Sequence, residues 1–594
     1  AAAPATEQAA VTNPLLVKST LQYEAPEFDK IKVEHYQPAM EEGIKQHMAE
    51  ILTIADNKEP ATFENTIVAM EKSGELLTRA TSTFFNMTGT ISNDEIQKIQ
   101  SEMAPKFAAH SDNINLNPQL FARVKAVYDA RATLGLDGEA TRLVEDYYER
   151  FVRAGANLTE EQKTKIRALN EEQSTLTNKY QQNLMAMKDQ IAVYVDTKEE
   201  LAGLSEAEIT AAAEGAKAKG KEGKFIIEIT NTTRQPALAS LENREVRKKV
   251  WKASAYRGTS GETDNQPIVA RLAQLRAERA KLLGYDNWAT YQLEPTMAKT
   301  PKAVLDMFGS MVPAVVENTK KEAEAIQAMI KETGGDFELQ PWDWEFYAEK
   351  VRKAKYDLDE AQVREYFEFE RVLNDGMFYT MNKLFGITMK ARPDLPVYHP
   401  DVKAYEVFDA DGTSIAIFYA DYFARDGKRG GAWMSSFVEQ SKLLNQKPVV
   451  VNVMNIPKGP AGEPTLVSYD NVTTMFHEFG HAVHGLFSDV TYPALAGTSV
   501  SRDFVEFPST FQEDWAAHPD VIGNYAKHYK TGEAIPAELL AKIMKSRSFN
   551  QGYDTLEYMS SALLDMEWHS LPADAPLQDV QKFEAAALKK HGVD

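Results

Sequence analysis

The sequence predicts a mainly α-helical protein that carries one small β-sheet. Apolar residues recur every three or four positions along most of the chain, which is the spacing of one face of an amphipathic helix. Strand-like runs are few, and most of them lie between residues 404 and 454, directly before a cluster of histidines. The 594 residues are enough for one large core or for two fused lobes.

The helical signals begin after residues 1–13, which are rich in alanine and are predicted to form a flexible tail. Thr159-Glu160-Glu161-Gln162 matches a capping box, a side-chain pattern found at the start of many helices. Beyond it, apolar residues repeat at helical spacing, namely Ile166, Leu169, Leu176, Tyr180, Leu184 and Met187. Similar amphipathic runs predict helices over 37–54, 62–110, 240–283 and 302–332.

Four short runs predict strands. Residues 225–229 (FIIEI) follow a Gly- and Lys-rich stretch that we expect to be an exposed loop. Residues 404–408 and 415–419 flank Asp411-Gly412, a dipeptide typical of hairpin turns, and 448–454 (PVVVNVM) form a further apolar run. Between these runs, the glycines of GKRGGAWM (427–434) predict a tight turn or a close backbone approach.

The composition argues against two classes of partner. The formal net charge is −21, from 66 basic and 87 acidic residues, whereas a non-specific nucleic-acid binder needs concentrated Lys and Arg for phosphate contacts. The longest apolar run, 448–457, has the length of a strand and not of a membrane span. We therefore expect neither nucleic acid nor membrane as a partner. With no cysteine, the chain has no disulfide, no thiol nucleophile and no Cys-ligated zinc.

The first residues, AAAPATEQAAVTNP, include no initiator methionine and are rich in Ala, Thr and Pro. They resemble the mature end that signal-peptide cleavage leaves, or a chain trimmed at this point. The first interpretation predicts a periplasmic protein, and the alternative is a cytoplasmic one.

Three of the eleven histidines lie within the twelve residues FHEFGHAVHGLF, 476–487. Apolar residues in and before this stretch repeat at helical spacing, and Ser468 or Asp470 is expected to cap the helix. His477 and His481 are then four residues apart on one face. Two imidazoles in this arrangement can bind one ion, and zinc binds neutral imidazole readily.

Glu478 completes the pattern HExxH, in which the glutamate acts as general base towards a water activated by zinc. Residue frequencies alone predict about 0.03 chance matches to this pattern in the whole chain. The alternative is a helix whose histidines are packed in the core or exposed to solvent. The pattern therefore predicts a catalytic zinc site with Glu478 as the base.

A catalytic zinc site needs a third protein ligand besides the two histidines. His484 is seven residues from His477, which is a rise of about 10 Å along a helix and too far for one tetrahedron. It also departs from the extended pattern HExxHxxGxxH, because it occupies the glycine position. We expect His484 to support the site, to face the substrate or, equally, to pack in the core.

Glu506 is the better candidate for the third ligand. It follows His481 by 25 residues and lies between Val505 and Phe507, where a carboxylate would be costly unless it were paired with a cation. Pro508 indicates a turn, so that a second helix is expected to meet the first at this point. The alternative is a glutamate that is only partly buried.

The stretches HEFGHAVHGLFS and AGTSVSRDFVEFPSTFQEDW resemble the zinc peptidases of the thimet oligopeptidase family. The resemblance continues upstream in PWDWEFY (341–347), in 417–437 and in 448–455. Weaker similarity is present at 13–21 and 234–241, so that the resemblance covers nearly the whole chain.

The resemblance implies one zinc ion per chain, with His477, His481 and Glu506 as ligands and Glu478 as general base. It also implies a monomer with two helical lobes around a deep central channel, which admits short peptides and excludes folded proteins. On this view residues 14–340 form a mainly non-catalytic lobe and 341–594 the catalytic lobe, with the small sheet near the active site.

Two activities occur in the family. One branch releases dipeptides from the free C-terminus of oligopeptides, and the other cuts peptides internally. The stretch 549–571 is more similar to the first branch. The resemblance therefore implies a zinc-dependent peptidyl-dipeptidase. The alternatives are an endo-acting oligopeptidase of the same family and a non-catalytic peptide-binding fragment.

Members of the family carry a late His- and Gly-rich segment followed by tyrosines, which supplies hydrogen bonds to the substrate. This chain stops at Lys589-Lys590-His591-Gly592-Val593-Asp594 without such a segment, and Tyr553, Tyr558 and His569 do not replace it. We therefore expect the catalytic lobe to be truncated and to act with a separate C-terminal fragment of the same protein.

Overall fold

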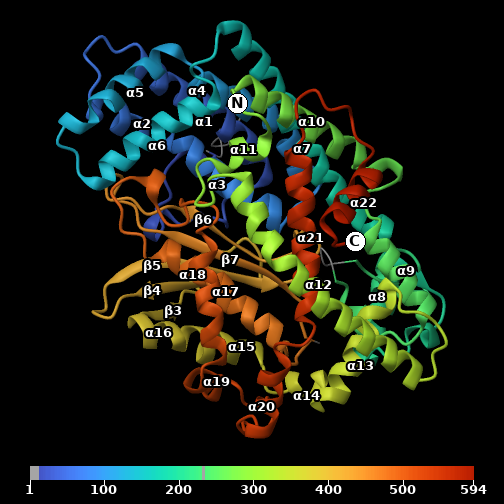
Figure 1. Ribbon diagram of the computed structural model, residues 1–594. Coiled ribbons are helices and arrows are strands. Elements are labelled where there is room, and N and C mark those ends of the chain that lie inside the picture. The colour runs from blue at the N-terminus through green and yellow to red at the C-terminus, as the bar shows by residue number, and fades with distance from the viewer. Residues whose placement is uncertain (1–12, 230–233, 460) are drawn as a thin grey trace, which may run out of the picture.

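The computed structural model of the chain describes residues 13–229, 234–459 and 461–594. It is mostly helical and contains two small sheets, so the predicted fold class is confirmed (Figure 1). The flexible tail predicted for residues 1–13 falls, except for Asn13, outside the described residues. Asn13 caps the short 3-10 helix Pro14–Leu16, because its side chain accepts a hydrogen bond from the backbone N–H of Leu15 at 3.0 Å.

The first part of the chain forms a helical layer, coloured blue to teal in Figure 1. The run predicted over 62–110 is divided, because Gly74 at φ +75° and a cap at Asn93 each start a new helix. The capping box at Thr159 is present. The main helices of this part are α1 (Tyr36–Ala55), α3 (Glu75–Thr90), α4 (Asp94–Asn115), α5 (Pro118–Ala130), α6 (Gly138–Ala154) and α7 (Glu160–Ile191).

The middle of the chain is also helical and adds a two-stranded sheet of β1 (Val193–Val195) and β2 (Phe225–Ile227). The run predicted over 240–283 is divided by a turn-rich segment, 256–265. The helices are α8 (Glu206–Ala218), α9 (Arg244–Ala255), α10 (Gln266–Leu282), α11 (Trp288–Leu293), α12 (Pro301–Glu332), α13 (Trp344–Tyr356), α14 (Glu360–Arg364), α15 (Phe369–Arg371) and α16 (Tyr379–Phe385).

Three strands of the five-stranded sheet, at 403–408, 414–423 and 449–456, lie where the sequence predicts strands, whereas those at 388–391 and 433–438 were not predicted. The order of the sheet is β3-β4-β5-β7-β6, built from β3 (Thr388–Ala391), β4 (Lys403–Phe408), β5 (Ser414–Phe423), β6 (Trp433–Val438) and β7 (Val449–Ile456). Gly412, at φ +85°, closes the predicted hairpin between β4 and β5. β7 runs parallel to β5 and antiparallel to β6, which is an edge strand.

The strands β5 and β7 are buried on both faces, as their continuous apolar sequences require. One face packs on the last third of the chain, where Phe418 and Val450 share a core with Phe476. The other face packs on the N-terminal helices, where Tyr419 and Val451 share a core with Phe84 and with residues of α1. The sheet is thus covered on one face by the N-terminal helices and on the other by the last third of the chain. The division into a lobe of residues 14–340 and a lobe of residues 341–594 stays a prediction.

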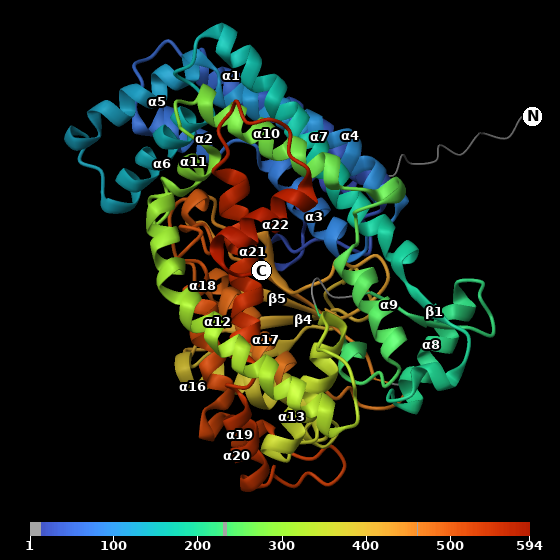
Figure 2. The ribbon, with the colours of Figure 1, turned by 45° about the vertical axis from the view of Figure 1, so that its right-hand side comes forward.

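The last part of the chain forms α17 (Tyr469–Leu486), α18 (Glu506–Glu513), α19 (Pro519–Tyr525), α20 (Ala537–Ser546), α21 (Gln551–His569) and α22 (Val580–His591). α21 runs beside α12, and the last residue lies about halfway up the molecule in both views (Figures 1 and 2). Among the described residues, none of the helices combines the length and the hydropathy that a membrane span requires.

A buried ion cluster joins the sheet to the N-terminal helices. The Asp421 side chain, at the end of β5, accepts hydrogen bonds from Lys428 Nζ at 2.9 Å and from Arg425 at 2.7 Å. Arg425 also donates to the carbonyl of Thr90 at the end of α3. Gly427, at φ +74°, lies so close to Ser92 that a Cβ would be 2.4 Å from the Ser92 carbonyl oxygen. The predicted close backbone approach of this loop is therefore confirmed.

Lys428 tests the contribution of the cluster to stability. The Asp421 and Lys428 side chains are both 0% exposed, and burial lowers the pKa of Lys428 to about 8. We expect Lys428→Met to lower the free energy of unfolding by about 3 kcal/mol, because Asp421 loses a buried partner. Urea denaturation followed by tryptophan fluorescence measures the change. The control is Lys403→Met, whose ion pair with Glu370 is about half exposed and should contribute less than about 1 kcal/mol. Equal effects of the two substitutions would contradict the prediction.

Candidate metal centre

The helix α17 carries the histidine cluster, and its start is fixed by Ser468 and not by Asp470. The Ser468 hydroxyl accepts a hydrogen bond from the Asn471 backbone N–H at 3.1 Å, and the Asn471 side chain accepts one from the Ser468 N–H. Phe476 and Phe479 are fully buried against the sheet. Because residues three apart share one face of a helix, these phenyl groups orient α17, and His477 and His481 project from a different face.

The helix α18 packs against α17 at Gly480, the glycine within HEFGH. A Cβ at this position would lie 2.7 Å from the Pro508 carbonyl oxygen and 2.7 Å from Ser509 Cα. Both are backbone atoms, so they cannot give way without a shift of α18 itself. A side chain at residue 480 would therefore push α18 away from α17.

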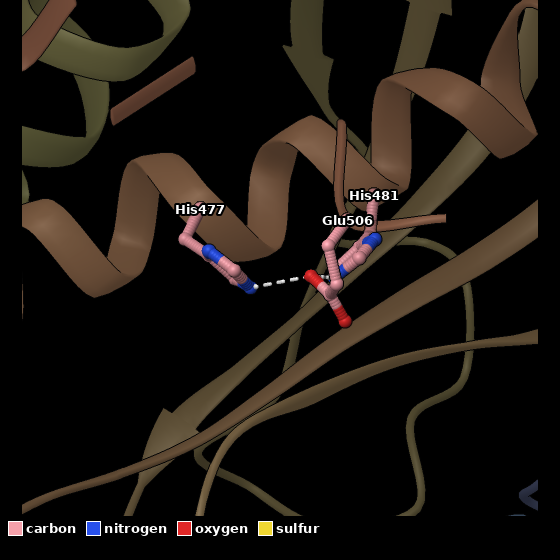
Figure 3. A group of neighbouring side chains, drawn as sticks. All are labelled: His477, His481 and Glu506. Atoms are coloured by element: carbon pink, nitrogen blue, oxygen red, sulfur yellow. Dashed lines mark ion pairs between the residues drawn. The ribbon is translucent and has the colours of Figure 1, made fainter. Parts of the chain in front are cut away.

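The close contact brings three potential metal ligands together. His477 Nε2 lies 3.3 Å and His481 Nε2 3.1 Å from the same oxygen, Glu506 Oε2. Figure 3 shows both imidazoles projecting from α17 towards this carboxylate. One ligand atom from each side chain lies within 4.8 Å of the other two. The structure therefore places all three residues that were predicted as ligands around one position.

These distances fit a tetrahedral zinc site. Ligand atoms about 2.05 Å from a tetrahedral ion are separated by about 3.3 Å, close to the two separations seen here. Two imidazole nitrogens and one carboxylate oxygen are also a ligand set that catalytic zinc sites use, with the fourth position left for water or substrate.

The surroundings of Glu506 differ from those that the sequence suggests. The prediction that apolar neighbours bury this carboxylate is wrong, because its side chain is 58% exposed and Phe507 is 64% exposed. The residue begins α18, where Phe507 faces solvent and Val505 is only partly buried. Partial burial opposes ionisation, but the Ser509 hydroxyl, which donates to Oε2 at 2.6 Å, and the two imidazoles outweigh it and lower the pKa of Glu506. The carboxylate is held by hydrogen bonds and charge.

Glu513 is a functional candidate that sequence reasoning missed. His477 Nδ1 lies 2.7 Å from Glu513 Oε1, so that this nitrogen carries the proton and leaves Nε2 free as a ligand. Burial opposes protonation of His477, but Glu513 and the nearby carboxylates reverse this effect and raise its pKa. Glu513 follows Glu506 by seven residues, two turns of one helix. This spacing of seven residues is the feature of the sequence from which Glu513 could have been predicted.

Glu478 lies beside the three candidate ligands and is 4% exposed. Its carboxylate Oε2 has no hydrogen-bond partner among the described residues, and burial raises the pKa of Glu478 to about 7. Its backbone carbonyl accepts a hydrogen bond from Asn452 Nδ2 of β7 at 2.9 Å. The sheet therefore fixes the backbone of Glu478, while Oε2 of its carboxylate has no hydrogen-bond partner among the described residues.

The other candidates lie outside the group of three. His484 does not join it; burial lowers the pKa of this half-buried histidine, and its Nδ1 has no partner among the described residues. Tyr553 stacks on Trp344 with ring centroids 4.2 Å apart, and Tyr558 is 75% exposed. His569 hydrogen-bonds to Arg276. These contacts give no sign that the side chains act at the metal centre.

Comparison with known proteins decides the family. The model of peptidase family M3 matches residues 237–593, more than half of the chain. The chain belongs to peptidase family M3. The family resemblance seen in the sequence is thereby confirmed. As a member of this family, the chain is a metallopeptidase.

Individual relatives agree with this assignment. The chain is 49% identical over 583 residues to dipeptidyl carboxypeptidase of Escherichia coli (strain K12), covering 98% of this chain and 86% of the relative. It is 29% identical over 569 residues to oligopeptidase A of Salmonella typhimurium, covering 94% and 83%. A solved structure of a putative oligoendopeptidase F is 13% identical, with a TM-score of 0.50, and covers 96% of this chain and 80% of that one. This last likeness concerns the fold alone.

Gly480 tests how the centre is assembled. We expect Gly480→Ala to displace α18, to reduce zinc retained after dialysis and to destabilise the protein by about 1 to 3 kcal/mol through overpacking. The control is Gly523→Ala in α19, where a Cβ would meet nothing within 4 Å. Zinc per chain is measured by atomic emission. Full zinc retention in Gly480→Ala would contradict the assembly described here.

Proposed function

We propose that this M3 chain is a zinc-dependent peptidyl-dipeptidase, which releases dipeptides from the free C-terminus of oligopeptides. The observation that carries the proposal is the 49% identity to a dipeptidyl carboxypeptidase along almost the whole chain. The meeting of His477, His481 and Glu506 supports it, because the same stretch of sequence supplies a complete set of zinc ligands.

The ligand set favours one zinc ion per chain. His477 and His481 would bind it through Nε2, and Glu506 through Oε2. A zinc ion in this position would supply Lewis acidity, which activates water for attack and polarises the scissile carbonyl. Glu513 would hold the His477 ring in the orientation and tautomer that binding requires.

Glu478 is proposed as the general base. Its buried carboxylate would accept a proton from the attacking water and then pass that proton to the leaving amine nitrogen. Its Oε2 has no hydrogen-bond partner among the described residues, so the carboxylate is available to take up the proton and return it. Its fixed backbone, held by Asn452, would keep the carboxylate in place during the transfer.

The proposed substrates are short peptides bound between a mainly non-catalytic lobe, 14–340, and a catalytic lobe, 341–594. Within the described residues, the hydrophobic core shared by the sheet, α1 and α3 would hold these two lobes together. A second candidate activity is internal cleavage of oligopeptides, which is favoured by 29% identity to oligopeptidase A. The two activities differ in their dependence on a free C-terminus.

Product analysis tests the proposed specificity. The zinc-loaded protein should release dipeptides stepwise from an unblocked peptide of about ten residues. The same peptide with a C-terminal amide should be cleaved at least about tenfold more slowly, because the terminal carboxylate is lost as a recognition group. Mass spectrometry identifies the products. Mainly internal cuts, equally fast on both peptides, would favour the oligopeptidase.

Glu478→Gln tests the general base. The amide keeps the shape of the side chain but accepts no proton, so hydrolysis should fall by about a hundredfold to ten thousandfold. Zinc content and peptide binding should be unchanged. The matched control is Glu584→Gln, an exposed glutamate of α22, with full activity. If Glu478→Gln retains activity within a few-fold of the parent, Glu478 is not the base.

A further inference from the structure

The segment that carries Glu506 to the histidine helix is long and irregular. α17 ends at Leu486 and α18 begins at Glu506, and between them the structure describes a single short 3-10 helix, Pro493–Leu495. A connection of this kind has many accessible conformations, whereas a metal ligand has to be held within about 0.5 Å of its place. The start of α18 therefore needs support besides its own backbone.

The first turn of α18 is not secured by a cap of its own. The residue before it, Val505, has no side-chain acceptor, so within the described residues no side chain at that position caps the helix. Helix ends whose backbone groups lack partners fray readily. The close contact with α17 is made further along, at Pro508 and Ser509. Glu506 precedes that contact and lies in the turn that frays most easily.

Asp503, three residues before Glu506, binds this turn to a distant part of the chain. Its Oδ1 accepts a hydrogen bond from the backbone N–H of Met297, and its Oδ2 accepts one from the N–H of Ala298, both at 2.9 Å. Ser501 donates its hydroxyl to the same carboxylate at 2.7 Å. Slight burial opposes ionisation, but these hydrogen bonds outweigh it and lower the pKa of Asp503. The ionised carboxylate thus binds two successive peptide N–H groups, a stronger contact than neutral hydrogen bonds would give.

The turn itself transmits this contact to the metal centre. The backbone N–H groups of Phe504 and Val505 both donate to the carbonyl of Ser501, at 2.9 and 3.1 Å. The same turn leads directly into α18. Because Asp503 and Glu506 lie at the two ends of one hydrogen-bonded turn, a displacement of the first carboxylate also displaces the second.

The distant segment is itself held in place. Met297 and Ala298 lie in the connection between α11 and α12. At the start of this connection, the Glu294 carboxylate accepts a hydrogen bond from Arg153 of α6 at 3.2 Å. At its end, the Thr300 side chain caps α12. Both ends of the segment are therefore anchored, and its two N–H donors have a defined position.

We propose that Asp503 is a positioning residue of the metal centre, which holds Glu506 where its carboxylate and the two imidazoles can bind one zinc ion (Figure 3). The inference rests on the proposed zinc site. Asp503 touches neither metal nor substrate and acts through Glu506 alone. A segment of the lobe proposed as mainly non-catalytic, 14–340, therefore contributes to the geometry of the metal centre.

Zinc affinity tests this role. Competition with a chelator of known affinity measures the dissociation constant of zinc, and the visible spectrum of the cobalt-substituted protein reports the ligand geometry. Asp503→Ala removes both acceptors, whereas Asp503→Asn keeps the size of the side chain and one acceptor. The matched control is Asp574→Ala, an exposed aspartate in the connection between α21 and α22.

We expect Asp503→Ala to bind zinc about three- to tenfold more weakly than the parent, which is less than the loss of a group in direct contact with a ligand. Asp503→Asn should lie between the two, and Asp574→Ala should equal the parent. The cobalt spectrum of Asp503→Ala should also change, because Glu506 takes a less defined position. Should Asp503→Ala fold poorly, Asp503→Asn decides.

A second background separates positioning from general destabilisation. In Glu506→Ala the ligand through which Asp503 acts is gone, so adding Asp503→Ala should cause no further loss of zinc affinity. An equal loss in both backgrounds, or no loss in the parent background, overturns the proposal. A parent that binds zinc but releases no dipeptides refutes the proposed activity, while the zinc series still decides the role of Asp503. A parent that binds no zinc overturns both.

Discussion

The metal centre depends on how closely α18 approaches α17 at Gly480. With hydrogen in place of a side chain, the backbone of Pro508 and Ser509 lies directly on the histidine helix. This contact brings Glu506, the first residue of α18, to both imidazoles and brings Glu513, two turns later, to the far side of His477. The distance between α17 and α18 therefore fixes the position of Glu506, a candidate ligand. It also fixes the position of Glu513, which orients His477, another candidate ligand.

The sheet supplies the second constraint, because it fixes α17 from the opposite side. Phe476 and Phe479 are buried in the core that α17 shares with the sheet, and Asn452 of β7 binds the Glu478 carbonyl. On its other face the same sheet packs against α1 and α3, and the Asp421–Lys428 cluster joins the end of β5 to the end of α3. The N-terminal helices thus stand in a fixed relation to the centre.

What the sequence predicts correctly is mostly local. His477 and His481 share a helix face by spacing alone, and the hairpin at Gly412 follows from one dipeptide. Glu506 was selected for a wrong physical reason, because burial cannot be judged from flanking residues when an exposed helix begins at that position. The role of Gly480 depends on the packing of α18 against α17, a tertiary contact that no periodicity reveals, whereas Glu513 could have been found only from its spacing of seven residues after Glu506.

The central claim is that two helices assemble a zinc site with two nitrogen ligands and one carboxylate from the protein. X-ray absorption at the zinc edge, on protein with metal content determined in parallel, tests it most directly. The account predicts one zinc per chain, with two imidazole nitrogens and one or two oxygens at about 2.0 to 2.2 Å. Zinc with three imidazoles, or protein that binds no zinc at micromolar concentration, would contradict it.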